Sequence, residues 1–251
     1  IRLRSGLGLS TAANPVFEGQ FSPYGTLGLF SKHFVQPQSD WPRNVTVAGF
    51  VFYDQLGVSF SSAAESSEDL AAFLGSGPPP IVFTLGSSAV MGSGSFFSES
   101  LKAAEQLRMR AVLLVGREQR QEFPRDLPDT AFVTDYAPYS ELLPRAAATV
   151  HQGGIGTTAQ ALRAGRPMLV VPWAHDQPDN AERARKLGVA RVLDRRRYTS
   201  AAAVREISEL VSRPNYARAA SELRSRLLTE NGVLAACDVI ETQIEGQRKR
   251  P

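Results

Sequence analysis

Cysteine and histidine are scarce in this sequence, which has one cysteine, Cys237, and three histidines in 251 residues. A single cysteine excludes a disulfide within the chain and a metal site built from several cysteines. The histidines, His33, His151 and His175, follow none of the spacings of a metal-binding motif. We therefore expect no metal ion, and the absence of disulfides favours a reducing, cytoplasmic location.

Long apolar runs are absent as well. No run approaches the roughly 20 residues that a membrane-spanning helix needs. The first four residues, Ile1 to Arg4, contain neither a methionine nor the basic-then-apolar pattern of a signal peptide. We expect no transmembrane segment, and the missing methionine indicates a fragment of a longer protein.

Positive charge is not clustered, although the formal net charge is +3. The basic runs Arg195–Arg197 and Arg248–Arg250 are short, which is typical of a solvated turn and a solvated tail. We therefore expect no nucleic-acid partner, because such proteins carry a basic patch or stripe. The mild positive charge is compatible with a small anionic ligand.

The residues that are present predict an α/β fold. From residue 81 onward, short apolar runs alternate with segments of helical spacing, which predicts parallel β-α-β units with right-handed crossovers. The runs are apolar throughout, as in strands covered on both faces. We predict a Rossmann-like, doubly wound parallel sheet. The expected strands are 81–85, 111–115, 131–133, 147–150, 168–171 and 190–193, and the expected helices are 96–109, 139–145, 157–164, 178–187, 200–212, 215–229 and 232–246.

The residues before this pattern differ in character. Residues 1–57 are rich in glycine, proline, serine and aromatic residues, and they offer only two short predicted strands, 27–30 and 45–50. The serine-rich segment that follows leads into the stiff spacer Gly77–Pro80. We predict that residues 1–57 are the end of a preceding domain with its linker, and that 58–251 form one domain.

A glycine-rich turn follows the predicted strand that ends at Val150. The sequence from His151 to Thr158 reads His-Gln-Gly-Gly-Ile-Gly-Thr-Thr, and a helical pattern begins within it. Free backbone N–H groups at such a helix start suit a phosphate. We expect the phosphate contacts from the His151 ring, the turn backbone and two threonine hydroxyls, although a plain turn with a threonine cap is an alternative. The candidate residues are His151, Gly153, Gly154, Gly156, Thr157 and Thr158.

A second polar loop follows the next predicted strand, 168–171. Asp176 and Gln177 stand just before the proline that opens the following helical pattern. A carboxylate and a carboxamide side by side suit the hydroxyl groups of a sugar, whereas Asp176 could instead cap the helix. Because parallel strands end at the same edge of a sheet, this loop should lie beside the glycine-rich turn.

Two more loops should reach this edge. Ser87 and Ser88 follow the first strand of the domain and could meet the same phosphates, or could belong to a flexible loop. Tyr136 and Ala137 follow the third strand, where an aromatic ring could stack on a base or could pack in the core.

Together these motifs resemble those of a known family. His-x-Gly-Gly-x-Gly-Thr-Thr followed by Pro-Trp-x-x-Asp-Gln-Pro-x-Asn resembles the nucleotide-sugar signature of glycosyltransferases that act on lipophilic small molecules. These include plant secondary-metabolite, sterol and bacterial macrolide enzymes. The resemblance extends to Trp41–Pro42, Gly49–Asp54, Phe83–Ser88 and Tyr136–Tyr139, so it covers most of the chain.

The resemblance implies a GT-B fold, with two facing Rossmann-like domains and the active site between them. This chain would be the C-terminal, donor-binding domain, preceded by the tail of the N-terminal acceptor domain, with helix 232–246 crossing back to that domain. Residues 151–158, with Ser87 and Ser88, would hold the donor diphosphate. Tyr136 and Ala137 would hold the base, and Asp176 and Gln177 the sugar.

The sequence also departs from the plant form of the signature. Gly154-Ile155-Gly156 replaces a Trp-Asn-Ser run, as in the bacterial relatives, and Ala159 stands where the plant form has a ribose-binding glutamate. UDP and dTDP therefore both stay open as the nucleotide. The family's catalytic base is a histidine of the N-terminal domain, so no catalytic residue is expected in this chain.

The implied reaction is an inverting, metal-independent transfer of a hexose, or a deoxyhexose such as rhamnose, to a flavonoid-, sterol- or macrolide-type acceptor. We expect this chain by itself to bind the nucleotide sugar without turnover, and to need the N-terminal domain as its partner. A nucleotide-sugar epimerase of the same fold and a non-catalytic nucleotide-binding or interaction domain are the alternatives.

Overall fold

The computed structural model describes residues 2–9, 21–53, 65–86, 92–116, 123 and 127–248. The chain divides into two compact units, a larger one of residues 52–229 and a smaller one of residues 1–51 and 230–251. The predicted boundary between residues 57 and 58 lies in a segment outside the described residues.

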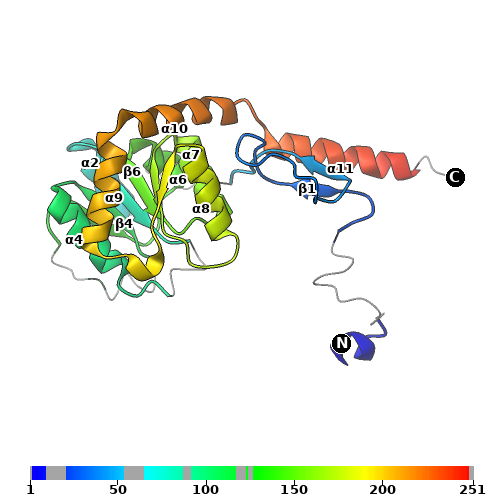
Figure 1. Cartoon of the computed structure of the whole chain (residues 1–251), viewed down its shortest axis with the longest axis horizontal. Helices are drawn as coiled ribbons and strands as arrows, with labels where there is room; N and C mark the ends of the chain where they lie inside the picture. The colour runs from blue at the N-terminus through cyan, green and yellow to red at the C-terminus, as the bar shows by residue number, and fades with distance from the viewer. Residues whose placement is uncertain are drawn as a thin grey trace. The chain divides into compact units, whose positions relative to one another are not determined.

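The larger unit is built on a parallel sheet with strand order β5-β4-β3-β6-β7-β8 (Figure 1). The chain runs from β3 to one edge through β4 and β5, returns to the centre at β6, and continues to the other edge through β7 and β8. The switch point of this doubly wound order is therefore between β3 and β6, where ligands bind at the carboxyl ends of the strands. The strands are β3 (Ile81–Thr84), β4 (Ala111–Leu114), β5 (Ala131–Thr134), β6 (Ala148–His151), β7 (Met168–Val170) and β8 (Ala190–Val192).

Helices follow most of these strands. Their ends have local causes: α7 stops at Gly165, whose φ of +68° is readily adopted by glycine, and α9 starts at Thr199, whose hydroxyl accepts the N–H of Ala202. The helices are α2 (Glu65–Gly75), α4 (Phe96–Leu107), α6 (Tyr139–Leu142), the 3-10 turn η1 (Leu143–Arg145), α7 (Ile155–Ala164), α8 (Gln177–Lys186), the 3-10 turn η2 (Arg195–Arg197), α9 (Ser200–Ser212) and α10 (Pro214–Leu227).

Helices cover both faces of the sheet (Figure 1). Alternate side chains of a strand point to opposite faces, and Ile81 and Phe83 of β3 pack in one apolar cluster with α4 and α9. Val82 lies between them and is also fully buried, so the other face is covered too. Helix α7 contacts β6 and α8 contacts β8, and these two helices contact each other. The near-continuous apolar strands of the sequence fit this double coverage.

The smaller unit contains two parallel strands, β1 (Thr26–Gly28) and β2 (Val45–Val47), and the helices α1 (Arg2–Gly6) and α11 (Gly232–Arg248). The start of α11 is tightly packed, because a Cβ on Gly232 would overlap the backbone of Gly49 and Phe50. Glu230 accepts a hydrogen bond from the Ser31 hydroxyl at 3.0 Å. The two ends of the chain are thereby joined in one unit.

The predicted elements of the α/β pattern are all present, with ends that differ by a few residues. Strand β6 differs in a way that matters for the site, since it continues through His151 and not only to Val150. In the described part of the chain, no helix is long and apolar enough to cross a membrane.

Candidate functional site

The residues that directly follow β3 and β6 meet at the switch point. The Gln152 side chain lies between them, so closely that a Cβ added to Gly86 would overlap its amide nitrogen and one added to Gly154 would lie 2.8 Å from it. Gln152 is 3% exposed, and its Oε1 has no hydrogen-bond partner among the described residues. Sequence reasoning passed over this residue, because a glutamine beside glycines carries no distinctive pattern.

The turn after β6 leaves backbone donors open. Gly154 is the N-cap of α7 and makes no side-chain cap, and Thr158 is the first helix residue whose N–H bonds back, to the Gly154 carbonyl. The N–H groups of the intervening residues have no partner within the helix. Gly156 is exposed, and a Cβ there would meet nothing within 4 Å. The start of α7 therefore presents N–H groups and the positive end of a helix dipole to open space.

His151 is fully buried beneath this turn. Its Nδ1 accepts the N–H of Gly153 at 3.0 Å, which places the ring proton on Nε2, 3.4 Å from the Sδ atom of Met168. Burial lowers the pKa of His151 to about 4, so the ring is neutral near pH 7. In this arrangement the His151 ring presents no N–H group at the surface for the predicted bond to a phosphate. The ring instead accepts a hydrogen bond from the backbone of the turn.

The two threonines also lie inside. Thr157 hydrogen-bonds to the partly buried Tyr139 side chain, and the Thr158 hydroxyl is buried with no partner among the described residues. Neither hydroxyl is at the surface where the predicted phosphate contact would need it. Among the three glycines of the turn, Gly153 has a positive φ, of +90°.

The loop between β7 and α8 is shaped by Gln177. Its Oε1 accepts the backbone N–H groups of Trp173 and Ala174 at 2.7 and 3.1 Å, so this oxygen is used within the loop. His175 has a φ of +59°, a conformation that is rare for a residue other than glycine. This loop is therefore held in one shape by its own glutamine.

Asp176 is exposed in the same loop, and it does not cap α8 with its side chain. Its Oδ2 accepts a hydrogen bond from Asn180 Nδ2 at 2.7 Å. The same Asn180 nitrogen donates to the carbonyl of Gly153 at 2.9 Å. The sequence analysis gave Asn180 no role of its own, and the structure buries it where it reaches both loops.

The loop after β5 brings Tyr136 and Ala137 to the same edge of the sheet. The Tyr136 side chain is 50% exposed, whereas Ala137 is buried. Three residues on, the hydroxyl of the partly buried Tyr139 lies 2.8 Å from the Thr84 hydroxyl at the end of β3. Burial raises the pKa of Tyr139, and hydrogen bonds with Thr84 and Thr157 act against that rise. Tyr139 thus connects this loop to the switch point.

Two predicted residues, Ser87 and Ser88, lie outside the described residues. In the part of the chain that the structure describes, no group of three histidine, cysteine, aspartate or glutamate side chains could hold a metal ion.

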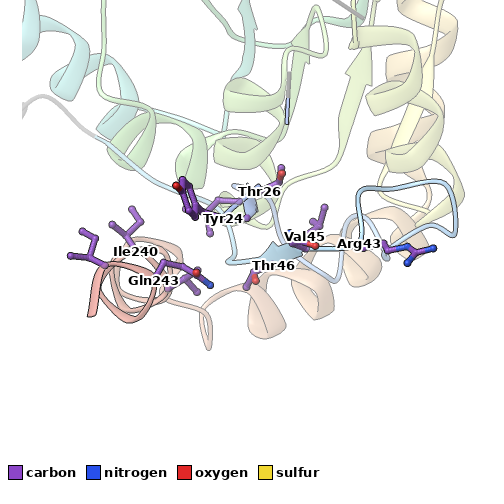
Figure 2. A pocket seen from close by; sticks show the side chains of 12 residues that line it. Tyr24, Thr26, Arg43, Val45, Thr46, Ile240 and Gln243 are labelled. Carbon is purple, nitrogen blue, oxygen red and sulfur yellow. The ribbon is translucent and has the colours of Figure 1, made fainter. Parts of the chain in front are cut away.

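A separate cavity of about 520 Å³ lies in the smaller unit, between the β1–β2 strands and α11 (Figure 2). Figure 2 shows Tyr24 and Thr46 from the strand region beside Ile240 and Gln243 of α11. None of the predicted donor-site residues lines this cavity. We name it the α11 groove.

Comparison with known proteins identifies the chain. Residues 98–234, which are more than half of the chain, match the family model described as erythromycin biosynthesis protein CIII-like, C-terminal domain. The chain belongs to this family. Its members have the GT-B glycosyltransferase fold, so the resemblance seen in the motifs is confirmed.

Individual proteins are also similar to this chain. The chain is 36% identical over 235 residues to the O-mycaminosyltylonolide 6-deoxyallosyltransferase of Streptomyces fradiae. The matched region covers 90% of this chain and 53% of that relative. The glycotransferase of kitacinnamycin superimposes with a TM-score of 0.76 at 26% identity, covering 96% of this chain and 60% of that one. The chain thus spans about half the length of the curated relative.

A third similar protein was solved with a nucleotide. Glycosyltransferase VinC, solved in complex with dTDP, superimposes with a TM-score of 0.59 at 27% identity and covers 69% of this chain and 44% of its own.

Proposed function

We propose that this chain is the donor-binding half of a glycosyltransferase, and that it binds a dTDP- or UDP-sugar at the carboxyl edge of its sheet. The observation that carries the proposal is the open start of α7 at the switch point between β3 and β6. The dTDP complex of VinC supports a thymidine nucleotide as the first ligand to test.

In this proposal the backbone N–H groups around Gly156 bind the diphosphate. His151 stabilises the turn through its hydrogen bond with the Gly153 N–H. Tyr136, half exposed at the end of β5, stacks on the base, and Asp176 accepts hydrogen bonds from the sugar. As the bond to the sugar breaks, charge grows on the leaving diphosphate, and the preorganised N–H groups and helix dipole stabilise it. The chain's own share of the reaction is thus to bind the donor and to stabilise the leaving group.

A substitution at Gly156 tests the site. Gly156→Leu adds a side chain to the open space over the helix start without a clash, so it should lower the affinity for dTDP more than about tenfold by blocking the diphosphate. Isothermal titration calorimetry with dTDP and UDP measures this. Gly246→Leu in α11 is the matched control, because its added side chain also meets open space. If wild-type chain binds neither nucleotide, the proposal is wrong.

We further propose that the full-length protein transfers a hexose or deoxyhexose, with inversion and without a metal, to a hydroxyl of a lipophilic acceptor such as a macrolide. The 6-deoxyallosyltransferase of Streptomyces fradiae, named for a macrolide-type acceptor, supports this class. Purified 1–251 should show no transfer from dTDP-glucose to a macrolide aglycone. Turnover by this chain alone would contradict the assignment of the catalytic base to the other half of the protein.

A further inference from the structure

The geometry of the two loops points to a role for Asn180. We propose that Asn180 is a positioning residue that couples the diphosphate turn after β6 to the sugar loop after β7. The inference rests on the proposed donor site and adds to it a residue that fixes the sugar-binding carboxylate relative to the diphosphate.

The hydrogen bonds of Asn180 use both hydrogens of its amide. Nδ2 donates to the Gly153 carbonyl at 2.9 Å and to Asp176 Oδ2 at 2.7 Å. Both partners are oxygen atoms that can only accept, so the NH₂ group of the amide, and not its oxygen, must face them. One side chain therefore bridges the two loops.

The burial of Asn180 indicates that these bonds decide its orientation. The residue is 6% exposed, in the first turn of α8 and four positions after Asp176, which places the two side chains on the same face of the helix. A buried amide without partners destabilises the fold, so the side chain is held where both bonds can form.

The two acceptors differ in what they can do for a ligand. Gly153 has a φ of +90°, and a Cβ there would lie 2.7 Å from the Val170 side chain and 3.2 Å from the Gln177 carbonyl, so the turn packs directly against the two residues that flank the second loop. Asp176 by contrast is exposed, and among the described residues its Oδ1 has no partner. Asn180 thus occupies one carboxylate oxygen and leaves the other oriented for a sugar hydroxyl.

This division predicts a ligand-specific effect. The diphosphate site depends on the turn backbone, which His151 and the contact with Val170 also hold. The sugar site depends on a single exposed carboxylate whose orientation Asn180 sets. Loss of Asn180 should therefore weaken binding of a nucleotide sugar more than binding of the nucleoside diphosphate alone.

The test uses chain 1–251 and calorimetry with dTDP and dTDP-glucose, or with UDP and UDP-glucose if the wild type prefers uridine. Asn180→Ala removes both bonds, and Asn180→Leu removes them at nearly constant volume, without a buried charge beside Asp176, in case the alanine variant folds poorly. Each should lower affinity for the nucleotide sugar about tenfold and affinity for the diphosphate less than about threefold.

A double-variant cycle separates positioning from general destabilisation. In an Asp176→Ala background, Asn180→Ala should cause little further loss of dTDP-glucose affinity, because the carboxylate it orients is gone. If the wild-type chain binds neither nucleotide, the proposed function itself is wrong. If the wild-type chain binds, but the Asn180 variants lose equal affinity for both ligands or the losses in the cycle are additive, only the role of Asn180 is wrong.

Discussion

At the scale of single residues, His151 shows how burial changes the role of a motif. The motif suggests a ring that donates to a phosphate, but the ring is fully buried and accepts the Gly153 N–H. A neutral ring is required for this bond, since a protonated Nδ1 would be a donor facing another donor. The stability of the turn should therefore depend on pH.

The pKa of His151, about 4 in the fold against 6.5 as its ordinary value, sets the window. Between these values the unfolded chain binds more protons, so stability falls as the pH falls from 6.5 toward 4, by up to about 3 kcal/mol. Urea unfolding across this range should show the slope, and His151→Gln should flatten it. An unchanged slope in the variant would show that another group is responsible.

Gly153 and Gly156 should differ in their tolerance of a side chain. Gly153→Ala places a Cβ at a φ of +90° and 2.7 Å from Val170, so it should lower the free energy of unfolding by about 1–3 kcal/mol. Gly156→Ala adds a methyl group to open space in a helix and should be neutral or stabilising. Chemical unfolding of the pair checks this, and equal losses would contradict the geometry.

At the scale of elements, Tyr139 ties three loops of the sheet edge together. It begins α6, and its hydroxyl hydrogen-bonds to Thr84 at the end of β3 and to Thr157 in α7. The order of strands alone would leave the loop after β5 far from β6, because β4 and β3 lie between them. This tyrosine holds that loop against the switch point.

Tyr139→Phe should therefore affect both stability and binding. It removes the shared hydroxyl and leaves buried threonine hydroxyls without a partner, so unfolding should become easier by about 1–3 kcal/mol. The loop that carries Tyr136 should also be less well held, which lowers dTDP affinity. Thermal unfolding and calorimetry measure the two effects, and Tyr216→Phe, whose hydroxyl lies 3.2 Å from Arg191 away from this edge, is a matched control. Wild-type stability in the variant would contradict the role of Tyr139.

The elements themselves were largely predictable, because their periodicity and their end signals agree. Helix 200–212 has the predicted bounds, with an N-cap threonine before it. Strand β6 was predicted to end one residue too early, at Val150, and this matters because side chains alternate between faces. Because β6 continues through His151, the ring points into the layer between the sheet and α7–α8. The sequence analysis had instead expected this ring to contact the ligand.

At the scale of the whole molecule, the smaller unit presents apolar side chains to solvent. Ile240 and Ile244 of α11 are each about half exposed, and both line the α11 groove with Tyr24 (Figure 2). We expect exposed apolar side chains gathered at a groove to favour association.

The isolated chain should consequently associate through this groove. Replacing Ile240 and Ile244 by glutamate should reduce self-association in light scattering, because charge disfavours apolar contact. Affinity for dTDP should stay unchanged, since the donor site is in the other unit. Thr242→Glu adds a charge on the same helix outside the groove and is the control. The same association in both variants would assign it to another surface.

The sequence by itself determined the α/β class, the order of elements and the family, because periodicity, glycine turns and a long motif are local properties of the chain. It also determined that the turn after β6 and the loop after β7 share one sheet edge, since parallel strands end together. Only the tertiary structure decided which side chains reach that edge. The side chains of His151, Thr157 and Thr158 are buried and do not lie at the surface of this edge. The packing of α8 lets Asn180 connect the two loops. Burial and packing both depend on contacts between residues that are distant in the sequence.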